Sequence, residues 1–131
     1  MKRYGLLLVA LFAVAINVNA QGFGGAVAFD GGEILVAETN NRVFAGDVYI
    51  FHKADGEWKT KTTLMAPGGG TDGDGFGASI AIHGDHLLVG SPGADGGRGA
   101  VYEFSRDGDN WTSSGMLPLP AMEAEGAGRK V

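Results

Sequence analysis

Residues 75–104, GFGASIAIHGDHLLVGSPGADGGRGAVYEF, decide the fold of this chain. A Phe-Gly step opens the stretch, alternating apolar residues lead through a tight polar turn into a second apolar run, and a Gly/Pro/Asp loop precedes a third run. The same plan appears 53 positions earlier (76 minus 23), in GFGGAVAFDGGEILVAETNNRVFAGDVYIF at residues 22–51. Such a tandem repeat is typical of arrays, propellers and solenoids. The positions that coincide at this spacing without gaps are Phe23/Phe76, Val36/Val89, Val48/Val101, Tyr49/Tyr102, Phe51/Phe104, Trp58/Trp111 and Leu64/Leu117.

Composition limits the class of protein and of partner. The 131 residues suffice for one small domain, and 24 glycines together with 44% hydrophobic residues indicate a folded, turn-rich chain. A formal net charge of −5 without a basic patch argues against a nucleic-acid partner. Lys53, Lys59 and Lys61 are expected on a solvated strand face. The chain has no cysteine, which excludes disulfides and cysteine chemistry.

Residues 1–20 have the pattern of a secretory signal peptide. Lys2 and Arg3 precede an apolar core at residues 6–16, and Ala20 is the small residue at the expected cleavage position. This core is shorter than the roughly 20 residues that span a bilayer, so no membrane span is expected after cleavage. We expect a secreted, extracellular or cell-surface protein, with the periplasm as an alternative compartment. An uncleaved anchor and a buried helix are the other interpretations.

The first repeat unit divides into four segments of strand length. We expect strands at residues 23–29, 33–37, 47–51 and 58–65, because these apolar runs are short and separated by turn residues. Turns are expected at residues 30–32 and 54–56, and a polar loop at 38–41. In the last strand, alternation predicts Trp58, Thr60, Thr62 and Leu64 on one face, and Lys59, Lys61 and Thr63 on the other.

The second unit repeats this division, with strands expected at residues 76–82, 87–89, 100–104 and 111–117. Four antiparallel strands with short turns are the composition of a propeller blade. We therefore expect an all-β fold: a first blade at 21–66, an inter-blade loop at 67–75, a second blade at 76–117, and a flexible tail or stub of a third repeat at 118–131. Gly128 falls where a third Gly-Phe-Gly would start, but Arg129 and Lys130 follow it.

These residues resemble FG-GAP repeats, the blades of the integrin α-subunit propeller and of many secreted relatives. The resemblance rests on Phe76-Gly77, on Leu88-Val89-Gly90-Ser91-Pro92 in place of a Gly-Ala-Pro signature, and on GAVYEF at residues 99–104. In the first unit Phe23-Gly24 and GDVYIF at 46–51 fit, whereas Ala37-Glu38-Thr39 does not reproduce the signature. The resemblance covers residues 22–117 and implies propeller blades that serve adhesion or recognition.

Calcium-binding members of this family carry an Asp-rich loop between the first and second strands. Here that place holds only Asp30-Gly31-Gly32-Glu33 in the first unit and His83-Gly84-Asp85-His86 in the second. Calcium takes six to eight oxygen ligands, which a two-residue turn does not provide. The other loop carboxylates, Asp72, Asp74 and Asp95, are interpreted as turn formers. No metal site is therefore expected.

Other candidate sites have simpler interpretations. His83 and His86 flank one turn, but two ligands do not close a metal site. Residues 22–25 are glycine-rich but precede a strand and lack the lysine of a phosphate-binding loop. Ser79, Ser91 and Ser105 lie outside any nucleophile elbow.

Two recurring or exposed features complete the set of candidates. Trp58 and Trp111 recur in register and are expected to pack within the blades, with sugar stacking as the alternative role. Asn110-Trp111-Thr112 fits the N-glycosylation pattern, although the sequence does not tell whether Asn110 is modified.

The function expected from the sequence is non-enzymatic recognition. No catalytic, cofactor-binding or metal residues are assigned, and the partner is expected to be a protein or carbohydrate bound through loops such as residues 38–46 and 92–99. A structural propeller segment of a larger secreted protein, or an accessory domain of a secreted enzyme, is the alternative. Propellers close with about four to eight blades, so two blades leave apolar faces exposed, and self-association through these faces is a further expectation.

Overall fold

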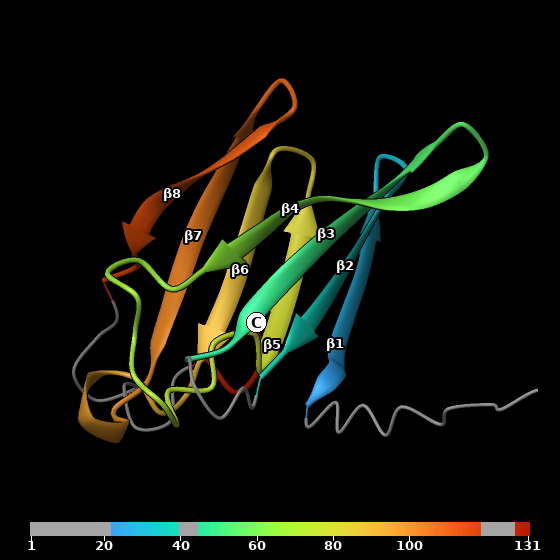
Figure 1. The fold of residues 1–131 in the computed structure, drawn as a ribbon. Helices are drawn as coiled ribbons and strands as arrows, with labels where there is room; N and C mark the ends of the chain where they lie inside the picture. Colours follow the sequence, from blue (N-terminus) through green and yellow to red (C-terminus); the bar gives the residue numbers. More distant parts are fainter. Residues whose placement is uncertain (1–21, 40–44, 119–127) are drawn as a thin grey trace, which may run out of the picture.

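The computed structural model describes residues 22–39, 45–118 and 128–131, and the leader predicted at residues 1–20 lies outside them. The described chain is all-β, as expected, apart from a three-residue 3-10 helix, η1 (Asp95–Gly97). Figure 1 shows the eight strands in chain order. They are β1 (Phe23–Asp30), β2 (Glu33–Glu38), β3 (Asp47–Ala54), β4 (Glu57–Met65), β5 (Ser79–His83), β6 (His86–Ser91), β7 (Ala100–Asp107) and β8 (Asn110–Met116).

The strands form two four-stranded antiparallel sheets, each in sequential order. The first sheet is β1-β2-β3-β4 and the second sheet is β5-β6-β7-β8. Tight hairpins join neighbouring strands at one end of both sheets, which we call the hairpin end, and longer loops gather at the opposite end, the loop end (Figure 1). At the first hairpin Gly31 and Gly32 have φ of 55° and 83°, and at the β3–β4 hairpin Asp55 and Gly56 have φ of 54° and 83°. These left-handed pairs match the two-residue hairpins that the sequence predicts.

The register of the two sheets repeats at the same spacing as the sequence. Val36 pairs with Tyr49 in the first sheet, and Val89 pairs with Tyr102 in the second. A bulge interrupts β3–β4 between Ile50 and Phe51, and the equivalent bulge interrupts β7–β8 between Glu103 and Phe104. The sequence repeat is therefore also a repeat of structure.

The bulge in β4 corrects the predicted alternation. Phe51 pairs with Thr60 and Ile50 pairs with Thr62, so Lys61 is the extra residue. Beyond it the faces are exchanged, because a bulge shifts the period of two by one residue. Thr63 therefore lies on the face of Trp58 and Thr60, whereas Thr62 and Leu64 lie on the opposite face. The predicted faces are wrong for these three residues.

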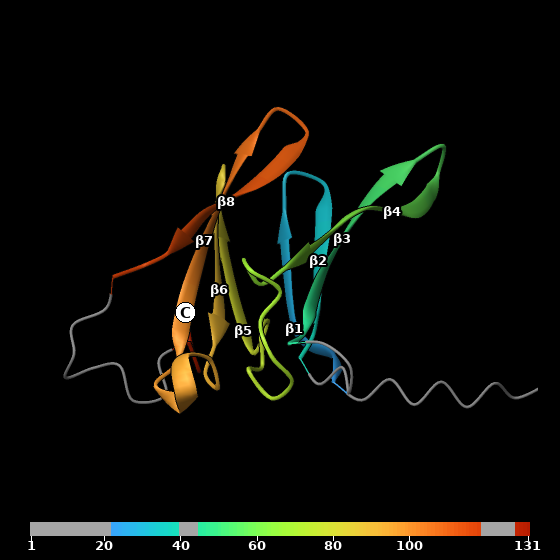
Figure 2. The ribbon, with the colours of Figure 1, turned by 60° about the vertical axis from the view of Figure 1, so that its left-hand side comes forward.

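Each sheet has an aromatic face and an aliphatic face. The aromatic face consists of Val27, Phe29, Ile34, Tyr49, Phe51 and Trp58 in the first sheet, and of Ile80, Ile82, Leu87, Tyr102, Phe104 and Trp111 in the second. The aliphatic face consists of Ala28, Leu35, Ala37, Val48, Ile50 and Leu64 in the first sheet, and of Ala81, Leu88, Gly90, Val101 and Leu117 in the second. The core joins the aliphatic face of the first sheet to the aromatic face of the second. Figure 2 shows the two sheets side by side.

The Phe76-Gly77 step lies in the turn before β5 and is buried between the sheets. The predicted strand at 76–82 is therefore too long, since β5 begins at Ser79. The amide of Phe76 donates to the carbonyl of Ala45 at 2.8 Å, and its ring contacts those of Tyr102 and Phe104. A Cβ on Gly77 would lie 2.9 Å from the Cβ of Ala37. The step therefore permits the close approach of the two sheets.

Gly128 takes the corresponding place on the aliphatic face of the second sheet. The hydroxyl of Ser79 donates to its carbonyl at 2.8 Å, and a Cβ on Gly128 would meet the backbone of Gly90 and Ala100. Gly90 and Ala100 are the repeat equivalents of Ala37 and Asp47, which Gly77 contacts. At the 53-residue spacing Gly128 aligns with Gly75. In the structure it occupies the place of Gly77 instead, two residues away from the register expected for a third repeat.

A polar network also ties the two sheets together at the hairpin end. Buried Glu33 of the first sheet accepts from the Arg106 guanidinium at 3.1 Å and from the Trp111 indole nitrogen at 3.4 Å. Lys61 Nζ also contacts Glu33 at 2.6 Å and reaches Asp109 of the second sheet at 3.0 Å. The expectation of a solvated Lys61 is wrong, because the bulge turns this side chain toward Glu33.

Gly77→Ala tests the close approach of the sheets, with Gly24→Ala as the matched control. Both glycines have left-handed φ, of 88° and 82°, but a Cβ on Gly24 meets nothing within 4 Å. Backbone strain of about 1 kcal/mol is expected for both variants. Gly77→Ala should lose at least about 1 kcal/mol more in urea unfolding, because its Cβ also pushes the sheets apart. Equal losses would contradict this explanation.

Glu33→Ala should destabilise the chain by about 2–4 kcal/mol, because it leaves Arg106, Lys61 and the Trp111 indole without their shared acceptor. Lys59→Ala is the control, since the Lys59–Asp55 pair at 3.5 Å is exposed. The control should change the free energy of unfolding by less than about 1 kcal/mol. Urea unfolding of the two variants measures the difference, and similar values would show that the network adds no stability.

Candidate functional site

The loop end presents a surface from the second sheet that is held by hydrogen bonds to the loop between the sheets. The tip of the loop at residues 92–99, one of the two loops expected to contact a ligand, is η1, where Asp95 has a left-handed φ of 53°. Residues 95–98 are exposed, whereas Ala94 beneath them is buried. Arg98 pairs with Asp95 at 3.7 Å. Of the other expected contact loop, residues 40–44 lie outside the described residues.

Asp74 holds the loops of this end together, and both its carboxylate and its carbonyl are engaged in hydrogen bonds. Its carboxylate accepts from the amide and the hydroxyl of Thr71, both at 2.7 Å. Its carbonyl accepts from the amide of Gly93 at 2.8 Å and from the hydroxyl of Ser91 at 3.0 Å. These hydrogen bonds agree with the interpretation of Asp74 as a turn former. Those of its carbonyl also fix the loop at 92–99 against the loop between the sheets.

Glu38, Asp47 and Tyr49 form an acidic cluster at the loop end of the first sheet. The Tyr49 hydroxyl donates to Glu38 at 2.8 Å, and this hydrogen bond, together with burial, raises the pKa of Tyr49 to about 12. Burial and then the charge of Glu38 raise the pKa of Asp47. Asp47 Oδ1 is buried without a hydrogen-bond partner among the described residues. The second repeat has Ser91 and Ala100 at the positions of Glu38 and Asp47.

Asp47→Ala should stabilise the chain at neutral pH. The folded chain holds the Asp47 proton more tightly than the unfolded chain, because its pKa is raised from the ordinary value of 3.8. Stability therefore falls as pH rises from that value through the folded pKa. Removing the carboxylate should raise the free energy of unfolding at pH 7 by about 1 kcal/mol, and the gain should shrink in acid.

Thermal unfolding as a function of pH measures this effect, and exposed Asp107 supplies the control variant Asp107→Ala. The control, at an exposed position, should not stabilise the chain at neutral pH. A gain from Asp47→Ala that is the same at acid and neutral pH would contradict the assignment to a buried carboxylate.

The three serines weighed as nucleophiles make hydrogen bonds to groups other than histidine. Ser79 bonds the carbonyl of Gly128, Ser91 bonds that of Asp74, and Ser105 bonds the hydroxyl of Ser114. Their hydroxyls position backbone or neighbouring strands in these contacts. This arrangement is structural rather than that of an activated nucleophile.

The histidine pair lies where the turn predicts it, with His83 opposite His86 in the β5–β6 ladder. His86 Nδ1 lies 3.2 Å from the Glu103 carboxylate. In the part of the chain that the structure describes, no three histidine or carboxylate side chains are grouped to hold a metal ion.

Asn110 of the glycosylation pattern is exposed at the β7–β8 hairpin, so its amide is accessible.

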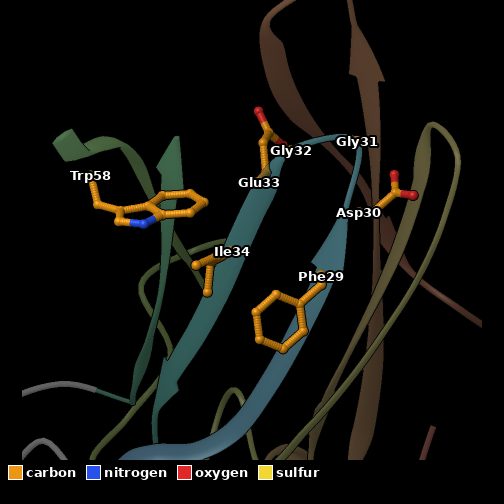
Figure 3. A pocket seen from close by; sticks show the side chains of 7 residues that line it. All are labelled: Phe29, Asp30, Gly31, Gly32, Glu33, Ile34 and Trp58. Atoms are coloured by element: carbon orange, nitrogen blue, oxygen red, sulfur yellow. The ribbon is translucent and has the colours of Figure 1, made fainter. Parts of the chain in front are cut away.

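A hollow of about 490 Å3 opens on the aromatic face of the first sheet. Figure 3 shows Phe29, Ile34 and Trp58 lining it from one side of the sheet. Asp30 lies at the edge of the hollow, and its carboxylate pairs with the Arg106 guanidinium at 3.2 Å on the opposite side of the sheet. Phe29 and Ile34 were not among the residues expected at a site, although they align with Ile82 and Leu87 of the second repeat, which are partly buried and buried, respectively.

The two tryptophans have different environments, which corrects the expectation that both pack within the blades. Trp111 is 8% exposed, under the Arg106 guanidinium at 5.0 Å from the ring centre. Trp58, its repeat equivalent, is 50% exposed. The difference arises because the first sheet covers the aromatic face of the second, while no described residue layer covers the aromatic face of the first (Figure 2).

No helix among residues 22–39, 45–118 and 128–131 combines the length and the apolar character needed to cross a bilayer.

Comparison with known families gives a match to part of the chain. Residues 58–104 match the FG-GAP repeat, in a stretch that begins in β4 of the first sheet and continues through β7 of the second. A comparison with curated proteins finds no match.

Proposed function

Because residues 58–104 of this chain are an FG-GAP repeat, we propose that the chain is a secreted or cell-surface recognition module without enzymatic activity. The leader pattern at residues 1–20 supports export. The repeat is compatible with adhesion or recognition, and the two packed sheets supply the rigid scaffold on which such proteins present variable loops. Within this proposal the ligand is a protein or a carbohydrate.

The loop at residues 92–99, exposed at its tip and hydrogen-bonded at its base, is the observation that carries the proposal. Its exposed tip projects from a loop end that Asp74 cross-links to the loop between the sheets. A surface that is ordered before binding loses little conformational entropy when a ligand docks. Glu38 and Asp95 give the loop end acidic character, which favours a ligand with basic or hydroxyl groups.

A structural role in a larger secreted assembly is the second candidate. The uncovered aromatic face of the first sheet favours it, because monomeric proteins rarely expose apolar patches that carry no function. In this role the sheets would be the contact surface and the loops would be tolerant of substitution.

Binding of the full chain to an array of immobilised proteins and glycans tests the proposal. The double variant Asp95→Asn, Arg98→Gln removes the charges of η1 and keeps its backbone, since asparagine tolerates a left-handed φ. It should weaken retention on the captured ligand by at least about tenfold, with unchanged thermal unfolding.

The matched control removes the exposed pair at the hairpin end, in the double variant Asp55→Asn, Lys59→Gln. This control should bind like the unmodified chain. Equal binding by both double variants would exclude the loop at 92–99 as the contact surface. Capture of no ligand by the array would favour the structural role.

A further inference from the structure

The aromatic face of the first sheet is exposed at positions that the second sheet buries. Phe29 is 71% exposed and Phe23 is 47% exposed, whereas Phe76, the repeat equivalent of Phe23, is fully buried. The rings of Phe23 and Tyr49 pack at a tilt of 51° with their centroids 5.7 Å apart, and those of Phe76 and Tyr102 pack at 55° and 5.8 Å. The exposed face therefore already has the internal arrangement of its buried counterpart, and lacks only the sheet that would cover it.

The chain itself shows what covers such a face. The aromatic face of the second sheet is covered by the aliphatic face of the first, through Leu35, Val48, Ile50 and Leu64. A surface of the same composition would fit the aromatic face of the first sheet, because the two aromatic faces share their register and bulge.

The second sheet carries such a surface on its outer side, where Leu88 is half-buried, while Val101 and Gly90 are buried and Gly128 lies against Gly90. Four positions of the two aliphatic faces are identical, namely Ala28/Ala81, Leu35/Leu88, Val48/Val101 and Leu64/Leu117. We propose that the aromatic face of the first sheet binds the aliphatic face of the second sheet of another copy of this chain, so that copies associate head to tail. The inference is independent of the recognition role proposed for the loops.

At the hairpin end, the aromatic face of the first sheet carries hydrogen-bond donors and the aliphatic face of the second sheet carries an acceptor, as in the contact within the chain. In the contact within the chain, Arg106 and Trp111 donate to the Glu33 carboxylate. Lys53 and Trp58 stand at the equivalent positions of the exposed face. On the aliphatic face of the second sheet, Glu103 stands where the first sheet has Ile50. The Glu103 carboxylate lies 3.2 Å from Nδ1 of His86, and His86 is the repeat equivalent of Glu33. Glu103 of one copy is thus the acceptor for Lys53 and Trp58 of the next.

The place of Gly128 supports the same docking geometry. It shows that the aliphatic face of the second sheet accepts a glycine where the first sheet accepts Gly77. In a docked copy the equivalent residue is Gly24, which has nearly the same left-handed φ as Gly77. Gly128 and the Gly24 of the incoming copy compete for this position, so the last residues of the chain move aside on association.

Sedimentation velocity of the full chain over about a hundredfold range of concentration tests the proposal. The unmodified chain should form species larger than a dimer, because a head-to-tail contact leaves one free face at each end. Phe29→Glu disables the aromatic face of the first sheet, and Leu88→Lys disables the aliphatic face of the second. Each variant alone should associate at least about tenfold more weakly than the unmodified chain.

An equimolar mixture of the two variants should form a one-to-one dimer, because each contributes the face that the other lacks. Asp72→Lys, in the exposed loop between the sheets, should assemble like the unmodified chain. Trp58→Gln replaces Phe29→Glu if that variant fails to fold by circular dichroism.

The proposal is overturned by an unmodified chain that stays monomeric, or by a mixture that stays monomeric. Dimers formed by Leu88→Lys alone would also overturn it, since they would show that the aromatic face binds a copy of itself.

Discussion

The contact between the aliphatic face of the first sheet and the aromatic face of the second is the interaction on which the rest of the structure depends. A four-stranded sheet cannot bury either of its own faces, so each repeat unit needs a neighbour. Here small and aliphatic side chains meet large aromatic ones, and Gly77 lets the backbones approach closely enough for the two layers to interlock. The same asymmetry gives the molecule a direction, with an aromatic face at one side and an aliphatic face at the other.

Buried polar groups make this contact specific. Glu33 is a carboxylate in an apolar interface, and it is tolerated because Arg106, Lys61 and Trp111 all donate to it. A shifted register between the sheets would leave these charges unpaired. The network thus selects one arrangement of the two sheets, whereas the apolar side chains alone would accept several.

Much of the fold could be predicted from the sequence, because strands and turns depend on local patterns. The 53-residue spacing, the two-residue hairpins and the sequential antiparallel sheets all follow from alternation and from glycine positions. The bulge at Lys61 could not be predicted, since it depends on pairing with Phe51 and Ile50 across the ladder. The different burial of Trp58 and Trp111 could not be predicted either, because identical residues in equivalent positions differ only in what covers them. The sequence therefore predicts the contact loops and the presence of uncovered apolar faces, whereas only the packing of the two sheets shows that the aromatic face of the first sheet is one of them.

Trp58 and Trp111 are the only two tryptophans of the chain, and their different environments give the molecule two intrinsic optical probes. The emission of Trp111, under Arg106 in the interface between the sheets, reports on whether the sheets are packed. Trp58 faces solvent beside Phe29, so a soluble quencher reaches it while the chain remains folded. The covering of the exposed face can thus be distinguished from unfolding in one unlabelled sample, because covering protects Trp58 from the quencher, whereas unfolding exposes both indoles.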